Sequence, residues 1–179
     1  MIVDIEELTD FTSDHGLLAE IAVQKLICTN FELKPGVLTM GYNPEYDFGI
    51  NNSLIELKFS RNNFQVTKVE VAREDKRPSG LSLTKSDVYA FFSQDSQTTA
   101  KLRLIRTADL YAYYLTKPTL AQQCFKTKGD HSGRIELPLN MSNLDNLGVG
   151  VCDYDGGLFY LDSFKPDPYA IDNIHKYIK

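Results

Sequence analysis

Three charged residues interrupt the apolar stretch YDFGINNSLIELKFS, which spans residues 46–60. The stretch reads as two short strands joined by a tight turn at residues 51–53, because its apolar positions alternate and Asn-Asn-Ser favours turns. Side chains alternate along a strand, so Glu56 and Lys58 project from the same face, roughly 6 to 7 Å apart. Pairing of the two strands as a hairpin brings Asp47 beside Glu56. The segment therefore predicts two carboxylates and one lysine at a single site.

These residue types suit chemistry on a phosphate. Two adjacent carboxylates repel each other, and burying them costs several kcal/mol unless a cation or hydrogen-bond donors compensate. Oxygen ligands favour Mg²⁺ or Mn²⁺, which retain waters and also bind phosphate oxygens of a substrate. Lys58 adds a cation that can lower the pKa of a metal-bound water or stabilise negative charge as phosphorus is attacked. The set predicts metal-dependent hydrolysis of a phosphodiester.

The elements that must position this site follow from periodicity. Residues 13–30 carry apolar side chains at three- and four-residue spacings, with Ser13 or Asp14 as the N-cap, and predict a helix. A second helix is expected over residues 107–116, capped by Thr107 and with Asp109 in its first turn. A polar loop is centred on residues 73–80. Further strands are expected at residues 36–42, 87–93, 101–107, 133–140, 149–154 and 158–164, the last two joined by a hairpin turn at residues 155–157.

Composition indicates a single globular domain in a reducing compartment. The chain has 179 residues, 42% of them hydrophobic, and its apolar runs are too short to cross a bilayer. The first ten residues are acidic where a signal peptide would be basic, and three widely spaced cysteines do not suggest a disulfide framework. We therefore expect a cytoplasmic, intracellular protein without a membrane segment. A helix followed by strands and mixed elements predicts an α/β or α+β fold, with a sheet and helices packed against it.

The charge is unevenly distributed along the chain. The net charge is -5, which by itself argues against a nucleic-acid partner. However, seven basic and three acidic residues lie between positions 58 and 85, whereas one basic and six acidic residues lie between positions 145 and 172. The basic middle adjoins the carboxylate site, so its charge favours a phosphate polymer as the partner. The acidic C-terminal third would face away from that polymer or contact a protein.

The order Asp47, then Glu56-Leu57-Lys58, with Pro44 shortly before the aspartate, resembles the PD-(D/E)xK nuclease superfamily, which has the restriction-endonuclease-like fold. The direct resemblance covers about residues 17–59. It implies a central mixed β-sheet flanked by helices, with a glutamate on an early helix joining the metal site. Glu20 occupies that place in this chain.

The resemblance implies a role for each residue of the site. Asp47, Glu56, Glu20 and the backbone of Leu57 would bind Mg²⁺ or Mn²⁺, and Lys58 would assist the attacking water. The implied activity is that of a deoxyribonuclease, an endonuclease, and the analogy extends to a homodimer and to a phage or mobile element as the source. The implied domain spans residues 1–179, with a catalytic core at about residues 13–115 and an acidic, β-containing extension at about residues 130–179.

Two alternatives stay open at this stage. The proline is not adjacent to the aspartate, so Glu45 competes with Asp47 for the first metal position; we prefer Asp47 because Phe48 and the turn place it deeper. The chain could also be a catalytically inactive nucleic-acid-binding or protein-interaction module on the same fold. In either case, the residues expected to contact DNA are Arg61, Lys68, Arg73, Lys76, Arg77 and Lys85.

Overall fold

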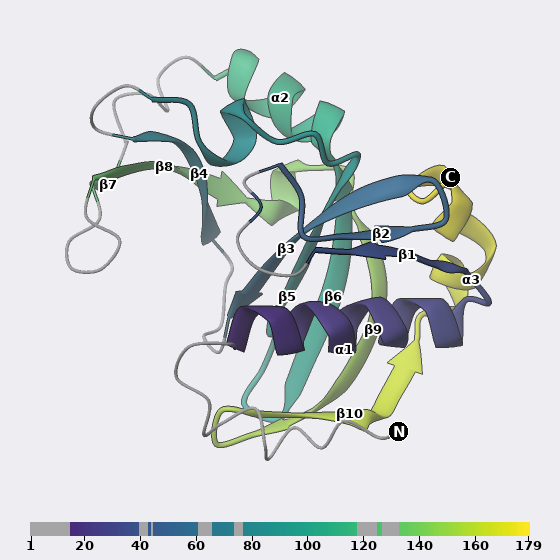
Figure 1. Ribbon diagram of the computed structural model, residues 1–179. Helices are drawn as coiled ribbons and strands as arrows, with labels where there is room; N and C mark the ends of the chain where they lie inside the picture. Colours follow the sequence, from purple (N-terminus) through teal and green to yellow (C-terminus); the bar gives the residue numbers. More distant parts are fainter. Residues whose placement is uncertain are drawn as a thin grey trace.

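A large mixed sheet forms the centre of the protein (Figure 1). The computed structural model describes residues 15–39, 43, 45–60, 66–73, 77–117, 125–126 and 133–179. The seven strands, in sheet order, are β1 (Pro35–Leu38), β2 (Phe48–Ile50), β3 (Ser53–Ser60), β5 (Val88–Gln94), β6 (Thr99–Arg106), β9 (Leu147–Asp155) and β10 (Leu158–Pro166). Only the β3 and β5 pair is parallel; the other neighbours are antiparallel. The predicted α+β class with a mixed sheet is confirmed.

The hairpin of β2 and β3 has the predicted turn. Phe48 pairs with Ile55 and Ile50 with Ser53, so the chain reverses at Asn51 and Asn52. Asn51 has a positive φ of 50°, a conformation that asparagine tolerates better than most residues. The strand expected at residues 36–42 is shorter than predicted, since β1 ends at residue 38 and residues 40–42 lie outside the described residues.

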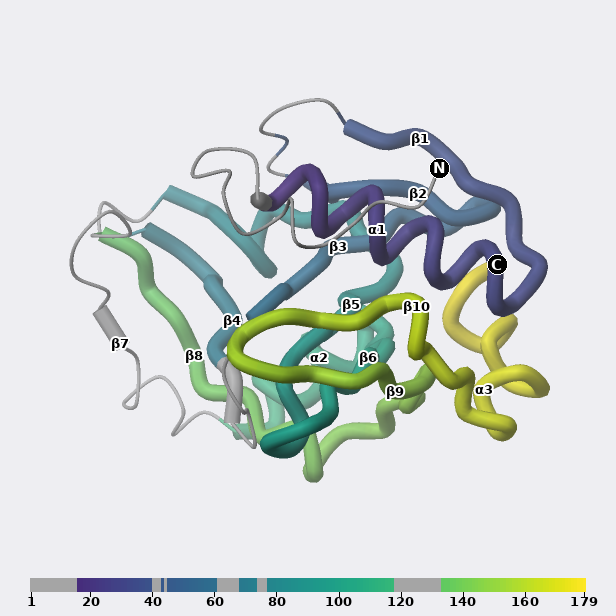
Figure 2. Tube along the Cα trace, turned by 90° about the horizontal axis from the view of Figure 1, so that it is seen from below, coloured from purple at the N-terminus to yellow at the C-terminus, as the bar shows by residue number. Residues whose placement is uncertain are grey.

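Helix α1 (His15–Asn30) covers one face of the large sheet, as Figures 1 and 2 both show. Its apolar side chains, including Val23 and Ile27, pack with sheet residues such as Ile55 in one core. The buried amide of Gln24 also donates a hydrogen bond of 2.8 Å to the carbonyl of Gly49 in β2. The predicted helix is confirmed, and its expected N-cap residues lie outside the described residues.

The opposite face of the sheet carries a second core. Tyr89, Phe91 and Ile105 pack there with Leu110 and Leu139. The covering elements are α2 (Thr107–Leu115), η2 (Gly80–Ser82), η5 (Met141–Asn143) and a small sheet in the order β4 (Val66–Arg73), β8 (Arg134–Asn140) and β7 (Phe125–Lys126). Strand β4 was not predicted. Its residues alternate as in a strand, but Lys68, Glu70 and the charged loop that follows obscured the pattern.

The capping role predicted for Thr107 is wrong. Thr107 is the first helical residue of α2, and Arg106 occupies the N-cap position without a side-chain cap. Asp109 does lie in the first turn, where its carboxylate accepts from the Arg106 guanidinium at 2.7 Å. The negative charge of Asp109 therefore interacts favourably with the positive end of the helix dipole, although the expected side-chain cap is missing.

The C-terminal third contributes two strands to the large sheet. Strand β9 pairs with β6, and β10 returns through the predicted hairpin turn, where Gly156 and Gly157 both have positive φ. The chain ends with α3 (Pro168–Asn173) and η6 (Ile174–Lys176), and Lys179 donates its N–H to the hydroxyl of Ser53 at 2.9 Å. In the part of the chain described here, no helix is long and apolar enough to span a membrane.

Candidate active site

The hairpin register places Asp47 beside Glu56. Asp47 directly precedes β2, and its N–H donates to the carbonyl of Ile55 at 2.9 Å. One of its carboxylate oxygens accepts a hydrogen bond of 2.6 Å from the N–H of Leu57. A short bond from a backbone N–H to a carboxylate is charge-assisted and fixes the acid firmly. The predicted pairing of Asp47 with the Glu56-Leu57-Lys58 segment is therefore present.

Leu57 presents its backbone at an open edge of β3. Strand β2 begins at Phe48, opposite Ile55, and no strand among the described residues pairs with β3 beyond Ile55 on this side. Backbone groups alternate along a strand, so the N–H and carbonyl of Leu57 face the same side as those of Ile55. The N–H is taken by Asp47, and the carbonyl points to the same edge. This carbonyl is the group that the resemblance implied as a ligand.

Glu56 and Lys58 share the face opposite Ile55 and Leu57, as the alternation predicted. Glu56 is only 9% exposed, and one of its oxygens lies 2.5 Å from the ammonium nitrogen of Lys58. Lys58 also sits 6.0 Å from the ring centroid of Tyr89 on the neighbouring strand. A buried carboxylate needs a cation or donors, and here Lys58 supplies the positive charge.

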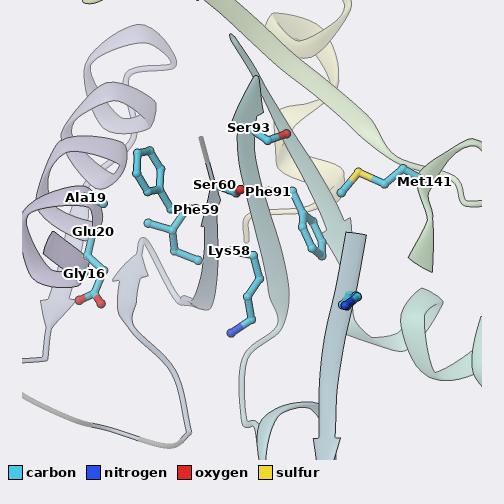
Figure 3. A pocket seen from close by; sticks show the side chains of 11 residues that line it. Gly16, Ala19, Glu20, Lys58, Phe59, Ser60, Phe91, Ser93 and Met141 are labelled. Carbon is cyan, nitrogen blue, oxygen red and sulfur yellow. The ribbon is translucent and has the colours of Figure 1, made fainter. Parts of the chain in front are cut away.

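Glu20 reaches the same place from α1. Figure 3 shows its carboxylate and the Lys58 ammonium directed toward the same side of the hollow between helix and sheet. The pKa of Glu20 is raised to about 7, mainly by burial; the charges of Asp47 and Glu56 also raise it, and Lys58 lowers it. Three acids and one lysine, from three separate segments of the chain, thus act on one another electrostatically.

The electrostatics of this cluster of acids favour a bound cation. The pKa of Asp47 is raised to about 6, mainly by burial and then by the charge of Glu56, while the Leu57 N–H and Lys58 lower it. A nearby divalent cation would favour the charged form of both Asp47 and Glu20 and relieve their repulsion. Within the described residues, no group of three or more Asp, Glu, His or Cys side chains is placed so that it could hold a metal ion. An oxygen donor set of this kind fits Mg²⁺, which completes its shell with water.

Glu45, the alternative for the first metal position, is directed elsewhere. Its carboxylate lies 2.7 Å from the ammonium nitrogen of Lys85, and both side chains are partly or largely exposed. Its carbonyl accepts hydrogen bonds from Thr84 and from the N–H of Lys85. Asp47, in contrast, faces Leu57 and Glu56. The geometry therefore favours Asp47 for that position.

Of the six residues expected to contact DNA, Lys68 lies at the site. It lines a pocket of about 420 Å³ together with Glu20 and Lys58. Arg73 and Arg77 are joined by a backbone hydrogen bond of 3.0 Å where β4 ends, and Lys85 pairs with Glu45. Arg61 and Lys76 lie outside the described residues.

The pocket contains residues that sequence reasoning missed. Phe91 and Ser93 enter it from β5, and Met141 from η5. Strand alternation could have placed Phe91 and Ser93 on the face of Lys58, because β3 and β5 are in register with Lys58 opposite Phe91. Nothing in the sequence indicates that Met141, about 50 positions further on, lies beside them.

Comparison of the chain with protein-family models, with curated proteins and with solved structures gave no match. The geometry and chemistry of the site itself are therefore the basis for a proposed function.

Proposed function

We propose that the protein is a Mg²⁺- or Mn²⁺-dependent nuclease of the restriction-endonuclease-like type that hydrolyses phosphodiester bonds in DNA. One observation carries the proposal: Asp47, Glu56, Lys58 and Glu20 lie together at the open edge of β3, although they come from α1, from β3 and from the residue before β2. Three acids close together repel one another, so their grouping around one partly buried lysine is unfavourable for the fold and suggests a functional role. A metal-dependent phosphodiesterase uses carboxylates to bind the metal ion and can use a cation to stabilise the charge on the phosphate.

Each residue has a distinct part in the proposed mechanism. Asp47, Glu56, Glu20 and the carbonyl of Leu57 would hold the metal ion, whose bound state supplies an activated water and neutralises phosphate charge. The N–H of Leu57 keeps the Asp47 carboxylate in a fixed orientation at 2.6 Å. Lys58, held against Glu56, faces the phosphate and stabilises the negative charge that develops as phosphorus is attacked. Lys68 adds positive charge on the substrate side.

A second candidate is an inactive nucleic-acid-binding module on the same fold. Its support is that Lys58 already neutralises Glu56 and that the Leu57 N–H already satisfies Asp47, so part of the charge is compensated within the chain. This reading predicts binding that needs no metal and survives Asp47→Asn. Its nucleic-acid-binding surface would include Lys58 and Lys68.

The deciding experiment is cleavage of supercoiled, linear, branched and single-stranded DNA with Mg²⁺ or Mn²⁺. Wild type is compared with Asp47→Asn and Lys58→Ala. Asp172→Asn in α3 and Lys165→Ala in β10 are matched controls, because both residues are exposed and lie on elements other than those of the site. Metal-dependent cutting that is lost in the first two variants and kept in the controls supports the nuclease. A folded wild type that cuts no DNA, but binds it without metal, supports the binding module.

The proposed substrate and assembly are tested alongside. Two active sites would address two strands, so a homodimer is proposed for cutting of duplex DNA, and light scattering of the purified protein measures its mass. An RNA strand of matched sequence in the cleavage panel tests whether DNA is the preferred polymer. The acidic residues of the last third are proposed as the surface of a protein partner, although Asp167 has a local role because it caps α3.

A further inference from the structure

The candidate active site opens into a pocket, and the proposed mechanism gives no role to the part of its wall formed by Phe91, Ser93 and Met141. The pocket has a volume of about 420 Å³ and lies between α1, the open edge of β3, β5 and η5. Figure 3 shows Lys58 in its middle, with Glu20 on the helix side and Met141 on the far side. A ligand in the pocket would therefore be next to the residues proposed to act on the phosphate.

Much of the wall is apolar and aromatic. Leu57 and Phe59 contribute from one side of β3, and Phe91 and Met141 from the other. Phe59 is 38% exposed although its ring packs against Phe159 at a centroid distance of 4.8 Å. Flat, apolar surfaces of this kind receive the ring faces of nucleobases.

A few polar groups complete the wall. Ser93 is only 3% exposed, lines the pocket, and has no hydrogen-bond partner for its hydroxyl within the described part of the chain. A buried hydroxyl without a partner is unfavourable, so its presence in a pocket wall indicates a ligand group that would complete the bond. Lys58 and Lys68 add positive charge, and Glu20 is the one acid among the described lining residues.

A neighbouring side chain repeats this pattern. Arg103 lies opposite Phe91 on β6, so it is a diagonal neighbour of Ser93 on the same face of the sheet. Its guanidinium forms an ion pair with Asp95, while its other terminal nitrogen is buried with no partner within the described residues. The face behind the pocket therefore holds two buried polar groups whose hydrogen bonds are unfilled.

We propose that the pocket receives an unstacked nucleobase from the nucleotide that adjoins the phosphate at the active site. This inference rests on the proposed nuclease function and names its substrate class: single-stranded DNA, or DNA with an unpaired nucleotide next to the cut bond. Small-ligand pockets have volumes of about 300 to 1,000 Å³, so this one accommodates a base and its sugar but not a stacked base pair. The Ser93 hydroxyl can donate to or accept from the edge of the base.

The geometry also explains why a paired base would be excluded. Lys58 lines the pocket and contacts Glu56, so the phosphate site and the pocket are adjacent. A base that stays in its stack cannot turn into the pocket while its phosphate remains at Lys58. An unpaired base leaves the stack at low cost and can turn inward.

The test uses the Asp47→Asn variant, which is expected to bind without cutting, and DNA carrying 2-aminopurine beside the scissile bond. The metal ion is omitted, so binding is read without activity. We expect a single strand to bind with a change in 2-aminopurine fluorescence, and replacement of that nucleotide by an abasic one to weaken binding about tenfold, as expected for the loss of one base contact. Equal affinity for the abasic strand would overturn the inference.

A variant that fills the pocket gives an independent test. Ser60 lines the pocket near the end of β3, and Ser60→Phe in the same Asp47→Asn background should lower affinity for the single strand about tenfold while the protein still melts cooperatively. Gln97→Phe, in the exposed turn between β5 and β6, is the matched control and should bind normally. Unchanged binding by the folded Ser60→Phe double variant would contradict the inference.

Failure of the inference and failure of the proposed function are distinguishable. If wild type cuts a fully paired duplex, a single strand and an abasic strand at equal rates, the nuclease proposal stands and the pocket proposal is wrong. If wild type cuts nothing, the nuclease proposal fails, and the abasic comparison still decides whether the pocket binds a base.

Discussion

The carboxylate of Asp47 is held 2.6 Å from the backbone N–H of Leu57, where β3 runs past the end of β2. This hydrogen bond and the hairpin position the Asp47 carboxylate without help from a ligand. The same relationship keeps a negative charge beside Glu56, whose charge raises the pKa of Asp47. A metal ion bound here would relieve that repulsion.

The first prediction concerns metal-induced stabilisation. Mg²⁺ or Mn²⁺ at about 100 times its dissociation constant should add about 2.7 kcal/mol to the free energy of unfolding, which is a rise in Tm of roughly 5 to 10 °C. Asp47→Asn keeps an acceptor for the Leu57 N–H but removes the charge, so it should lose most of this rise. Thermal melting with and without metal measures it. Asp172→Asn should show the same metal-induced rise in Tm as wild type. If Asp47→Asn also showed the full wild-type rise, Asp47 would be excluded as a ligand.

The second prediction concerns pH. The pKa values of Glu20 and Asp47 are raised to about 7 and about 6, so the folded protein holds their protons more tightly than the unfolded chain. Their contribution to stability is present at low pH and is lost as the pH rises through these values. Without metal, the Tm difference between Glu20→Gln and wild type should therefore grow in favour of the variant between about pH 5 and about pH 8.

Melting curves across that pH range check the prediction. Asp172→Asn, which removes an exposed acid far from the site, should keep the wild-type pH profile. A Glu20→Gln profile parallel to that of wild type would mean that Glu20 titrates normally. Addition of Mg²⁺ should flatten the wild-type profile, because the metal ion favours the charged acids.

Part of the candidate site could be predicted from the sequence because three of its residues lie close together in the chain. Asp47, Glu56 and Lys58 lie within 12 residues, on two strands whose alternation and turn are legible, and the register follows from the turn. Glu20 was accessible only through the resemblance to a nuclease family. Its approach to Asp47 depends on how α1 packs across the sheet, which periodicity does not fix.

Other parts of the fold depend on long-range contacts. Strand β4 alternates like a strand, but its charged residues and the adjacent loop concealed it, and it is stabilised by pairing with β8 some 65 positions later. Helix α3 was not predicted, although its start follows a recognisable sequence signal: Asp167 is the N-cap and Pro168 lies in the first turn. The pocket combines β5 with η5, and no local pattern connects Ser93 to Met141.

The third prediction separates the two roles of Lys58. Lys58→Ala should reduce metal-dependent cleavage by roughly 10² to 10⁴, the range typical of a group that assists proton transfer or charge stabilisation. It should also lower stability by about 1 to 3 kcal/mol, because the buried Glu56 loses its charged partner. Urea denaturation and initial cleavage rates measure the two effects.

A double variant isolates the catalytic part. Lys58→Met with Glu56→Gln removes both charges together, so it should recover much of the stability while remaining inactive. Lys165→Ala should change neither property. Cleavage by the folded Lys58→Ala protein at the wild-type rate would remove Lys58 from the mechanism.

The fourth prediction concerns the contact that joins the helix to the hairpin. The buried amide of Gln24 donates a hydrogen bond of 2.8 Å to the carbonyl of Gly49. Gln24 lies one turn of α1 beyond Glu20, and Gly49 lies two residues beyond Asp47. Gln24→Leu leaves that carbonyl without its donor and should lower the free energy of unfolding by about 1 to 3 kcal/mol. Because the contact sets the spacing of Glu20 and Asp47, the metal-induced rise in Tm should shrink as well. Asn30→Leu, which removes an amide contact at the far end of the same helix, is the control: it should lower stability but keep the full metal effect. A Gln24→Leu protein with an unchanged metal-induced rise would show that this contact stabilises the fold without positioning the site.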